Sequence, residues 1–259
     1  MDRKIFYPLQ QVDEVDFLKL QRNAMVALGH AVQMMVGKDP VADGLECEPT
    51  SPASMAVKVG PGTVTAYVAI DDTDFGTLDA NANPIVKMGL RDTTATYALT
   101  PPTSAGQSVK YLIQAAFDEN DTDSVVLPYF NEPDPPNPLS GPGDAGTSQN
   151  TTRATQVAVE AKRGTPATTG LESVPAVSTG YLPLWIVTVA YGQTTVTSAN
   201  IIPDPDAPWV SKLTDQWAPI DSPVFTGDPT CPTPATANSV VNRAYADAIL
   251  SVASVATAA

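Results

Sequence analysis

The sequence predicts a mainly β protein with one long N-terminal helix and a short C-terminal helix. Residues 14–37 repeat apolar side chains with a helical period, and residues 45–203 alternate with a period of two between turn residues. Residues 204–236 instead carry a proline every few positions, which is incompatible with a central strand. We therefore expect a helix region (1–44), an all-β domain (45–203) built as an antiparallel sandwich or barrel-like body, and a Pro-rich connector with its helix (204–259).

The composition permits a sizeable core and disfavours several partners. Of the 259 residues, 43% are hydrophobic, and the net charge of −14 includes only 14 Lys and Arg. Nucleic acid is not expected as a partner, because phosphate contacts are made mainly by Lys and Arg. The most apolar window, residues 25–36, is shorter than the roughly 20 residues of a membrane span, so no membrane insertion is expected. Cys47 and Cys231 belong to no cysteine cluster.

The helix is expected to begin after Asp13 as N-cap and to end at Gly37. Two apolar stripes run along it, so it is expected to pack on more than one side. The first stripe comprises Val15, Leu18, Met25, Leu28, Val32 and Met35, and the second comprises Phe17, Leu20, Ala24, Ala31 and Met34. Five residues of the first stripe are predicted to contact a second copy or a larger assembly: Leu18, Met25, Leu28, Val32 and Met35.

Strands are predicted where apolar residues alternate between turns. They cover residues 55–59, 64–70, 94–100, 108–119, 125–130, 155–164, 182–192 and 193–202. The run at 182–191 is apolar on both faces, which places it centrally. Residues 131–153 are rich in Pro, Gly and Asn and predict a long functional or partner-contacting loop.

The C-terminal part is expected to make contacts with neighbours. Trp209, Trp217 and Phe225 stand alone along the Pro-rich connector, and isolated aromatic residues on an extended strip usually dock on a partner. After Asn238 the pattern becomes helical, with a short heptad seam at Val241, Tyr245, Ala248, Val252, Val255 and Ala259. Because an isolated helix this short is marginal in water, self-association would stabilise it.

Catalytic and metal-binding residue sets are scarce. His30 is the only histidine and lies within the first helix, so a structural role is expected and no triad or multi-histidine metal site can be assembled. Residues 118–123 resemble the start of a calcium loop but lack its Gly and its final Glu. We therefore predict no enzyme activity, no cofactor and no metal. Paired carboxylates among Asp71, Asp72, Asp74 and Asp118 leave a glycan-cleaving enzyme as an alternative.

Two parts of the sequence, each made of two stretches, resemble tail fibre proteins of tailed bacteriophages. The sequence SPVFTGDPTCPTPA at residues 222–235, followed by NRAYAD at 242–247, is similar to a fibre motif that precedes a short helix or shaft repeat. Residues 111–153 and 182–201 resemble the N-terminal region that attaches such fibres to the tail baseplate. The resemblance implies an elongated homotrimer docked on baseplate or tail-tip proteins.

The resulting hypothesis is a structural virion protein, assembled in the bacterial cytoplasm and located in the phage tail. Only a short helix follows the fibre motif, so we expect a proximal fibre segment or adaptor, with a distal fibre protein as a further possible partner. The other alternative is a receptor- or glycan-binding module that uses the loop at 131–153 together with Trp209 or Trp217.

Overall fold

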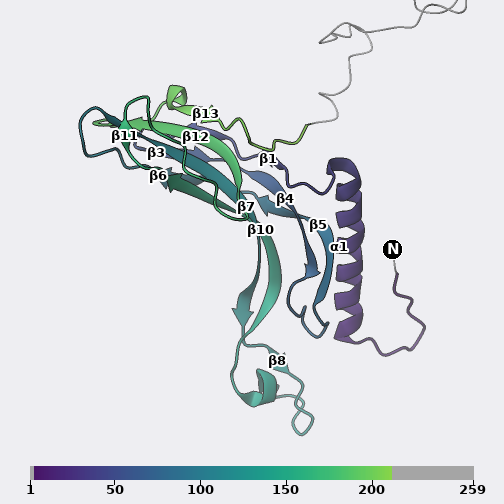
Figure 1. The fold of residues 1–259 in the computed structure, drawn as a ribbon. Helices are drawn as coiled ribbons and strands as arrows, with labels where there is room; N and C mark the ends of the chain where they lie inside the picture. Colours follow the sequence, from purple (N-terminus) through teal and green to yellow (C-terminus); the bar gives the residue numbers. More distant parts are fainter. Residues whose placement is uncertain (1–2, 212–259) are drawn as a thin grey trace, which may run out of the picture. The chain divides into compact units, whose positions relative to one another are not determined.

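The structure is a computed structural model that describes residues 3–211, and these residues are mainly β with one α-helix (Figure 1). The predicted C-terminal helix, its seam residues and Trp217 and Phe225 lie outside the described residues. The elements are α1 (Glu14–Val36), β1 (Ala42–Gly44), β2 (Cys47–Pro49), β3 (Ala56–Val59), β4 (Gly62–Asp71), β5 (Asn81–Arg91), β6 (Ala95–Ala98), β7 (Gln107–Val125), β8 (Pro128–Tyr129), β9 (Leu139–Ser140), η1 (Pro142–Asp144), β10 (Gln149–Arg163), β11 (Ala167–Thr168), β12 (Leu182–Ala190), η2 (Ser198–Asn200) and β13 (Ile201–Pro203).

Helix α1 has the predicted bounds. Asp13 is the N-cap with extended backbone, although its side chain makes no capping hydrogen bond, and Gly37 ends the helix with φ of 83°. Gly29 faces β5 so closely that a Cβ atom there would lie 2.8 Å from the carbonyl oxygen of Val86. The absence of a side chain at Gly29 therefore allows the helix to pack directly on the sheet.

The main sheet curls into a half-barrel, as the barrel-like alternative expected, but it is mixed and not wholly antiparallel. Its strand order is β1-β4-β5-β10-β7-β12-β13, with β11 also paired to β7. All neighbours in it are antiparallel except β5 and β10, which are parallel and share a single register pair, Leu90 with Gln156. Beyond that pair the β4–β5 hairpin and the β7–β10 hairpin diverge (Figure 1). We call this divergence the fork.

The core lies between the inner face of the curled sheet and a second, three-stranded sheet in the order β2-β3-β6. Its fully buried side chains are mostly branched aliphatic residues, among them Val57, Val59, Val109, Leu184 and Val187. Burial of such side chains is the main favourable contribution to folding. Most of the expected strands are found, so the periodicity located the core correctly.

The compact unit extends past the expected boundary at Pro203 and includes residues up to Val210. The Ala42 N–H donates to the Pro208 carbonyl at 2.9 Å, and the Val210 N–H donates to the Ala42 carbonyl at 2.9 Å. The Trp209 ring packs on Trp185, with 5.6 Å between ring centroids. The first residues of the predicted connector therefore complete the β domain.

Several segments differ from the predicted strands. Strand β5 was not predicted, the expected strand at 125–130 is reduced to the short β8 after the end of β7, and the expected strand at 193–202 is reduced to β13 after a loop and η2. The predicted loop at 131–153 is also shorter, because Gln149–Arg163 forms β10 and pairs with β7 as far as Val125. Residues 118–155 thus form a two-stranded ribbon with β8, β9 and η1 at its end, which we call the arm.

Candidate functional site: an apolar helix face beside a charged fork

One side of α1 is apolar and exposed. The exposed fraction is 68% for Met35 and 88% for Met34. The other large exposed hydrophobic residues of this face are Phe17, Leu20 and Leu28, and the exposed Ala24 and Ala31 complete the stripe. Contiguous apolar surface of this kind usually marks an interaction site. This face consists mainly of the second predicted stripe, together with Leu28 and Met35 of the first, and we call it the helix face.

Three other residues of the first stripe contact the chain's own body. Val32 is buried, Met25 lines a cavity beside Phe75 and Arg153, and Leu18 lies over Gly76. Of the five predicted partner contacts on the helix, Leu18, Met25 and Val32 therefore lie on the side that packs on the sheet, and Leu28 and Met35 lie on the helix face. Trp209, also predicted to contact a partner, is partly buried against the core of its own domain. The helical period alone could not distinguish the two sides of α1.

An apolar groove runs between the helix face and β5. It has a volume of about 190 Å³ and is lined chiefly by Leu28, Val32, Val86, Met88 and Leu90. Leu28 and Leu90 are both more than half exposed, so the groove opens to solvent. An apolar side chain from outside the unit can reach it.

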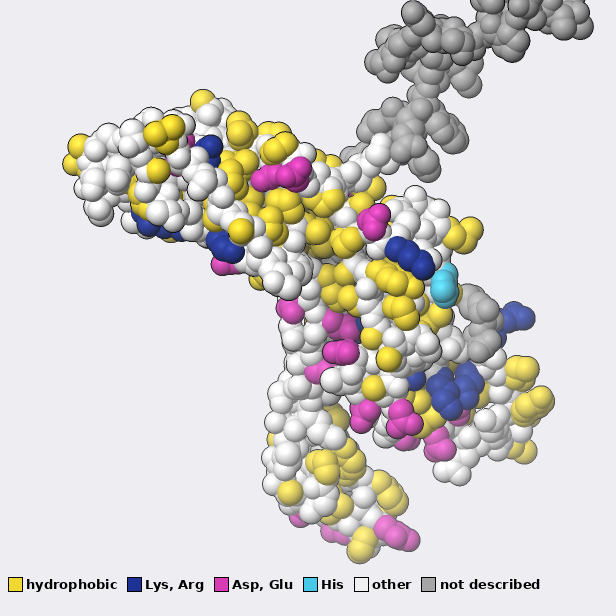
Figure 2. Space-filling model, in the orientation of Figure 1, with side chains coloured by type: hydrophobic (Ala, Val, Ile, Leu, Met, Phe, Trp, Pro, Cys, Tyr) yellow, Lys and Arg dark blue, Asp and Glu magenta, His cyan; other side chains and the backbone are white. Residues whose placement is uncertain are grey.

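A second apolar patch lies at the end of the arm. Phe130 is 76% exposed, and Val125, Val126 and Tyr129 beside it are also exposed. Figure 2 shows hydrophobic side chains at this end, separated from the body by a stretch of mainly polar surface. We call these four residues the arm tip. Two-stranded ribbons are marginally stable alone in water, so contacts at the base and at the tip matter for the arm's order.

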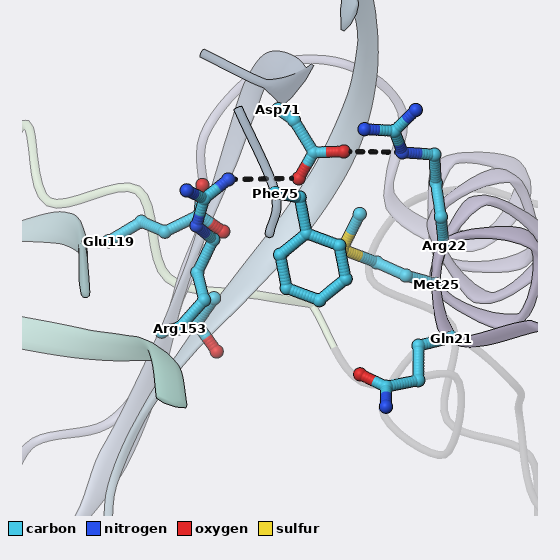
Figure 3. A pocket seen from close by; sticks show the side chains of 8 residues that line it. Gln21, Arg22, Met25, Asp71, Phe75, Glu119 and Arg153 are labelled. Atoms are coloured by element: carbon cyan, nitrogen blue, oxygen red, sulfur yellow. Dashed lines mark hydrogen bonds and ion pairs between the residues drawn. The ribbon is translucent and has the colours of Figure 1, made fainter. Parts of the chain in front are cut away.

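The base of the arm is held at the fork by Asp71, which is buried at the end of β4. Its Oδ1 accepts a hydrogen bond from Arg153 of β10 at 3.1 Å, and its Oδ2 lies 2.6 Å from Nε of Arg22 on α1 (Figure 3). The Arg22 pair is an ion pair whose N–H is not aligned for a hydrogen bond. Arg22 also donates to the carbonyl of Asp79. One carboxylate thus links the helix, the β4–β5 hairpin and the arm.

Arg153 is the most connected residue of the fork. Besides Asp71 it binds Asp121 of β7 through two hydrogen bonds of 2.7 and 2.9 Å, and it donates to the carbonyls of Thr73 and Asp74. Its guanidinium carbon lies 5.3 Å from the centre of the Phe75 ring, within the range of a cation–π contact. The hydrogen bond between Arg153 and Asp121 lowers the pKa of Asp121 and raises the pKa of Arg153, because it favours the charged form of both groups.

A second ion pair spans the fork nearer the point where the strands meet. Nζ of Lys87 on β5 donates to both carboxylate oxygens of Glu119 on β7, at 2.8 and 2.6 Å. The exposed fractions of the two side chains are 2% and 14%. Glu119 and Arg153 both line a cavity of about 230 Å³, together with Gln21, Met25 and Thr155 (Figure 3). Lys87 and Arg153 had no role in the sequence interpretation, because their partners are distant in sequence.

The candidate catalytic carboxylates are placed as follows. Asp71 is bound by two arginines, Asp74 accepts a hydrogen bond from the Ala80 N–H, and Asp118 accepts one from Asn120. Asp72 lines a shallow pocket with Asp121 and Arg153. Within residues 3–211, no three His, Cys, Asp or Glu side chains are grouped to bind a metal ion, and no helix is both long and apolar enough to cross a membrane.

Comparison with known proteins adds no relative. The chain matches no protein family, no curated protein and no solved structure.

Proposed function

We propose that this protein is a structural component of a bacteriophage tail, a proximal fibre or fibre adaptor that assembles as a homotrimer and attaches to the baseplate. The observation that carries the proposal is the helix face, a stripe of Phe, Leu, Ala and Met side chains exposed over the length of α1. Proteins that act alone rarely expose such a surface. The similarity of residues 222–235 to the fibre motif gives the class of assembly.

The position of the helix supports attachment or assembly through this face. The opposite side of α1 is fixed to β5 by the close approach at Gly29 and to β4 by the ion pair of Arg22 with Asp71. The helix face is therefore presented on a firmly held element, and binding would require little ordering of the backbone. Preorganisation of this kind favours association, since less conformational entropy is lost on binding.

The first test is the absolute mass of the purified chain in solution, measured by light scattering. A trimer has three times the chain mass of 27.1 kDa. A second chain that ends after Ser211 retains Trp209 on Trp185 and removes the predicted seam. We expect a trimer for the full chain and weaker association for the shorter chain. A monodisperse monomer of the full chain at all concentrations would refute the proposal.

A further inference from the structure

One exposed apolar surface of the chain lies on a projection and another lines a groove. The arm tip, at the end of the projecting arm, includes the exposed aromatic residues Tyr129 and Phe130 (Figure 2). The groove between α1 and β5 is concave and has a volume of about 190 Å³. An apolar cavity of about 150 Å³ is sufficient to bind benzene, so this groove can accept a phenyl ring.

The two surfaces also differ in charge. At the end of the arm, residues 124–148 contain the exposed Glu132, Asp134 and Asp144 and neither Lys nor Arg. Among residues 3–38, which include α1, Lys4 pairs with Asp16 and Arg22 with Asp71, which leaves Arg3, Lys19 and Lys38 outside these pairs, in a chain that has twice as many acidic as basic residues. Lys19 and Lys38, near the two ends of the helix face, are exposed. An acidic arm approaching this region would be attracted, whereas most of the surface would repel it.

The geometry of one chain keeps the two surfaces apart. The arm extends away from the body beyond the fork, and α1 lies on the other side of the β4–β5 hairpin (Figure 1). Ion pairs at Asp71 and Lys87 fix the base of the arm in this direction. The tip therefore needs the groove of another molecule. A contact between two different patches is heterologous, and repetition of such a contact produces a closed ring when the rotation closes.

We infer that the arm tip of one copy, led by Phe130, inserts into the α1–β5 groove of a second copy and so closes a ring of three chains. The inference rests on the proposed homotrimer and specifies how its chains contact one another. It differs from a bundle in which the three α1 helices pack on one another about the axis. Each chain would then offer its tip to one neighbour and its groove to the other.

Cross-linking between two different variants tests this arrangement. In a Cys231→Ser background, Leu28→Cys places a thiol in the groove and Phe130→Cys places one at the tip. Cys47 can be retained, because burial raises the pKa of its thiol to about 12 and leaves it unreactive at neutral pH. The two full-length variants are co-expressed with different tags, purified through both tags and treated with a short bismaleimide. Leu171→Cys, on an exposed apolar residue outside both patches, replaces Phe130→Cys in the control.

We expect a cross-linked species of twice the chain mass for the Leu28→Cys and Phe130→Cys pair, and none above background for the Leu171→Cys control. The change Phe130→Ser should lower the mass in solution, and Leu171→Ser should not. A trimer in which Leu28→Cys links to itself and not to Phe130→Cys would overturn the inference and leave the proposed function standing. If the unmodified chain is a monomer, both are refuted.

Discussion

The buried ion pair at the fork provides the sharpest test of the structure. Replacing Lys87 by Met keeps most of the unbranched side chain and removes its charged end, which leaves the Glu119 carboxylate without the two hydrogen bonds of 2.8 and 2.6 Å. Breaking a buried pair in this way typically costs about 3–5 kcal/mol. Glu119 retains 14% exposure and shares a cavity with Arg153, which can offer partial compensation, so the lower end, about 3 kcal/mol, is expected.

The double variant Lys87→Met with Glu119→Leu separates the penalty from the net value of the pair. Replacing both charged groups by apolar ones is often neutral or stabilising, so most of the loss should be recovered. A double-mutant cycle, measured by urea unfolding of the chain ending after Ser211, gives the coupling energy. At about 2–4 °C per kcal/mol for a chain of this size, the single Lys87→Met variant should unfold roughly 6–12 °C lower. Two results would refute the buried pair. One is a loss of less than about 1 kcal/mol of unfolding free energy in each single variant, and the other is a loss in the double variant that equals the sum of the losses in the two single variants.

Three other changes test separate contacts. Gly29→Val places Cβ 2.8 Å from the Val86 carbonyl oxygen and should lower the free energy of unfolding, measured with urea, by about 1–3 kcal/mol. The control Ala31→Val, on the exposed helix face, should lower it little. Equal losses in the two variants would contradict the close packing of α1 on β5. Trp209→Ala removes the ring that packs on Trp185 and should lower the free energy of unfolding by about 2–3 kcal/mol, less than the loss of a fully buried Trp. Tyr191→Ala, at an exposed site, serves as the control. An unchanged urea midpoint for Trp209→Ala would place residue 209 outside the core. Arg153→Met should raise the pKa of Asp121, which Arg153 holds below the ordinary value of 3.8, as measured by carboxyl carbon NMR. Because the pKa of Asp121 is lower in the folded than in the unfolded chain, its carboxylate stabilises the fold at pH values above the unfolded pKa. This stabilisation is lost as the pH falls through the folded pKa. An unchanged titration of Asp121 in the variant would mean that Asp121 and Arg153 do not interact.

The sequence predicted the helix and strands correctly where the period of the apolar residues matches the side that is buried. Helix α1 and most of the strands, including the apolar β12, have clear patterns, and their positions follow from them. Strand β5 was missed because Pro84, Lys87 and Gly89 interrupt its apolar residues. Each interruption has a local explanation. Pro84 lies next to a register irregularity in β4, Lys87 is buried in an ion pair, and a Cβ atom at Gly89 would clash with the Gln156 carbonyl oxygen.

The candidate site was less predictable than the fold. A helical wheel shows that α1 has two apolar stripes, but it cannot say which stripe β5 covers, and the close contact at Gly29 decides this. The fork was not predictable either, because Arg22, Asp71 and Arg153 are separated by 49 and 82 positions in the chain. Likewise the strand character of residues 149–153 depends on pairing with 121–125 and is hidden by their polar side chains.

The fork also determines how the protein would respond to a pulling force. Strands β5 and β10 share one register pair, so a force that separates the arm from the β4–β5 hairpin does not act on a long ladder of backbone hydrogen bonds. It acts first on Arg153, then on Lys87, and only afterwards on the junction of Leu90 with Gln156. The side-chain ion pairs would therefore open in sequence and could re-form when the tension ends, while the core between the two sheets stays intact.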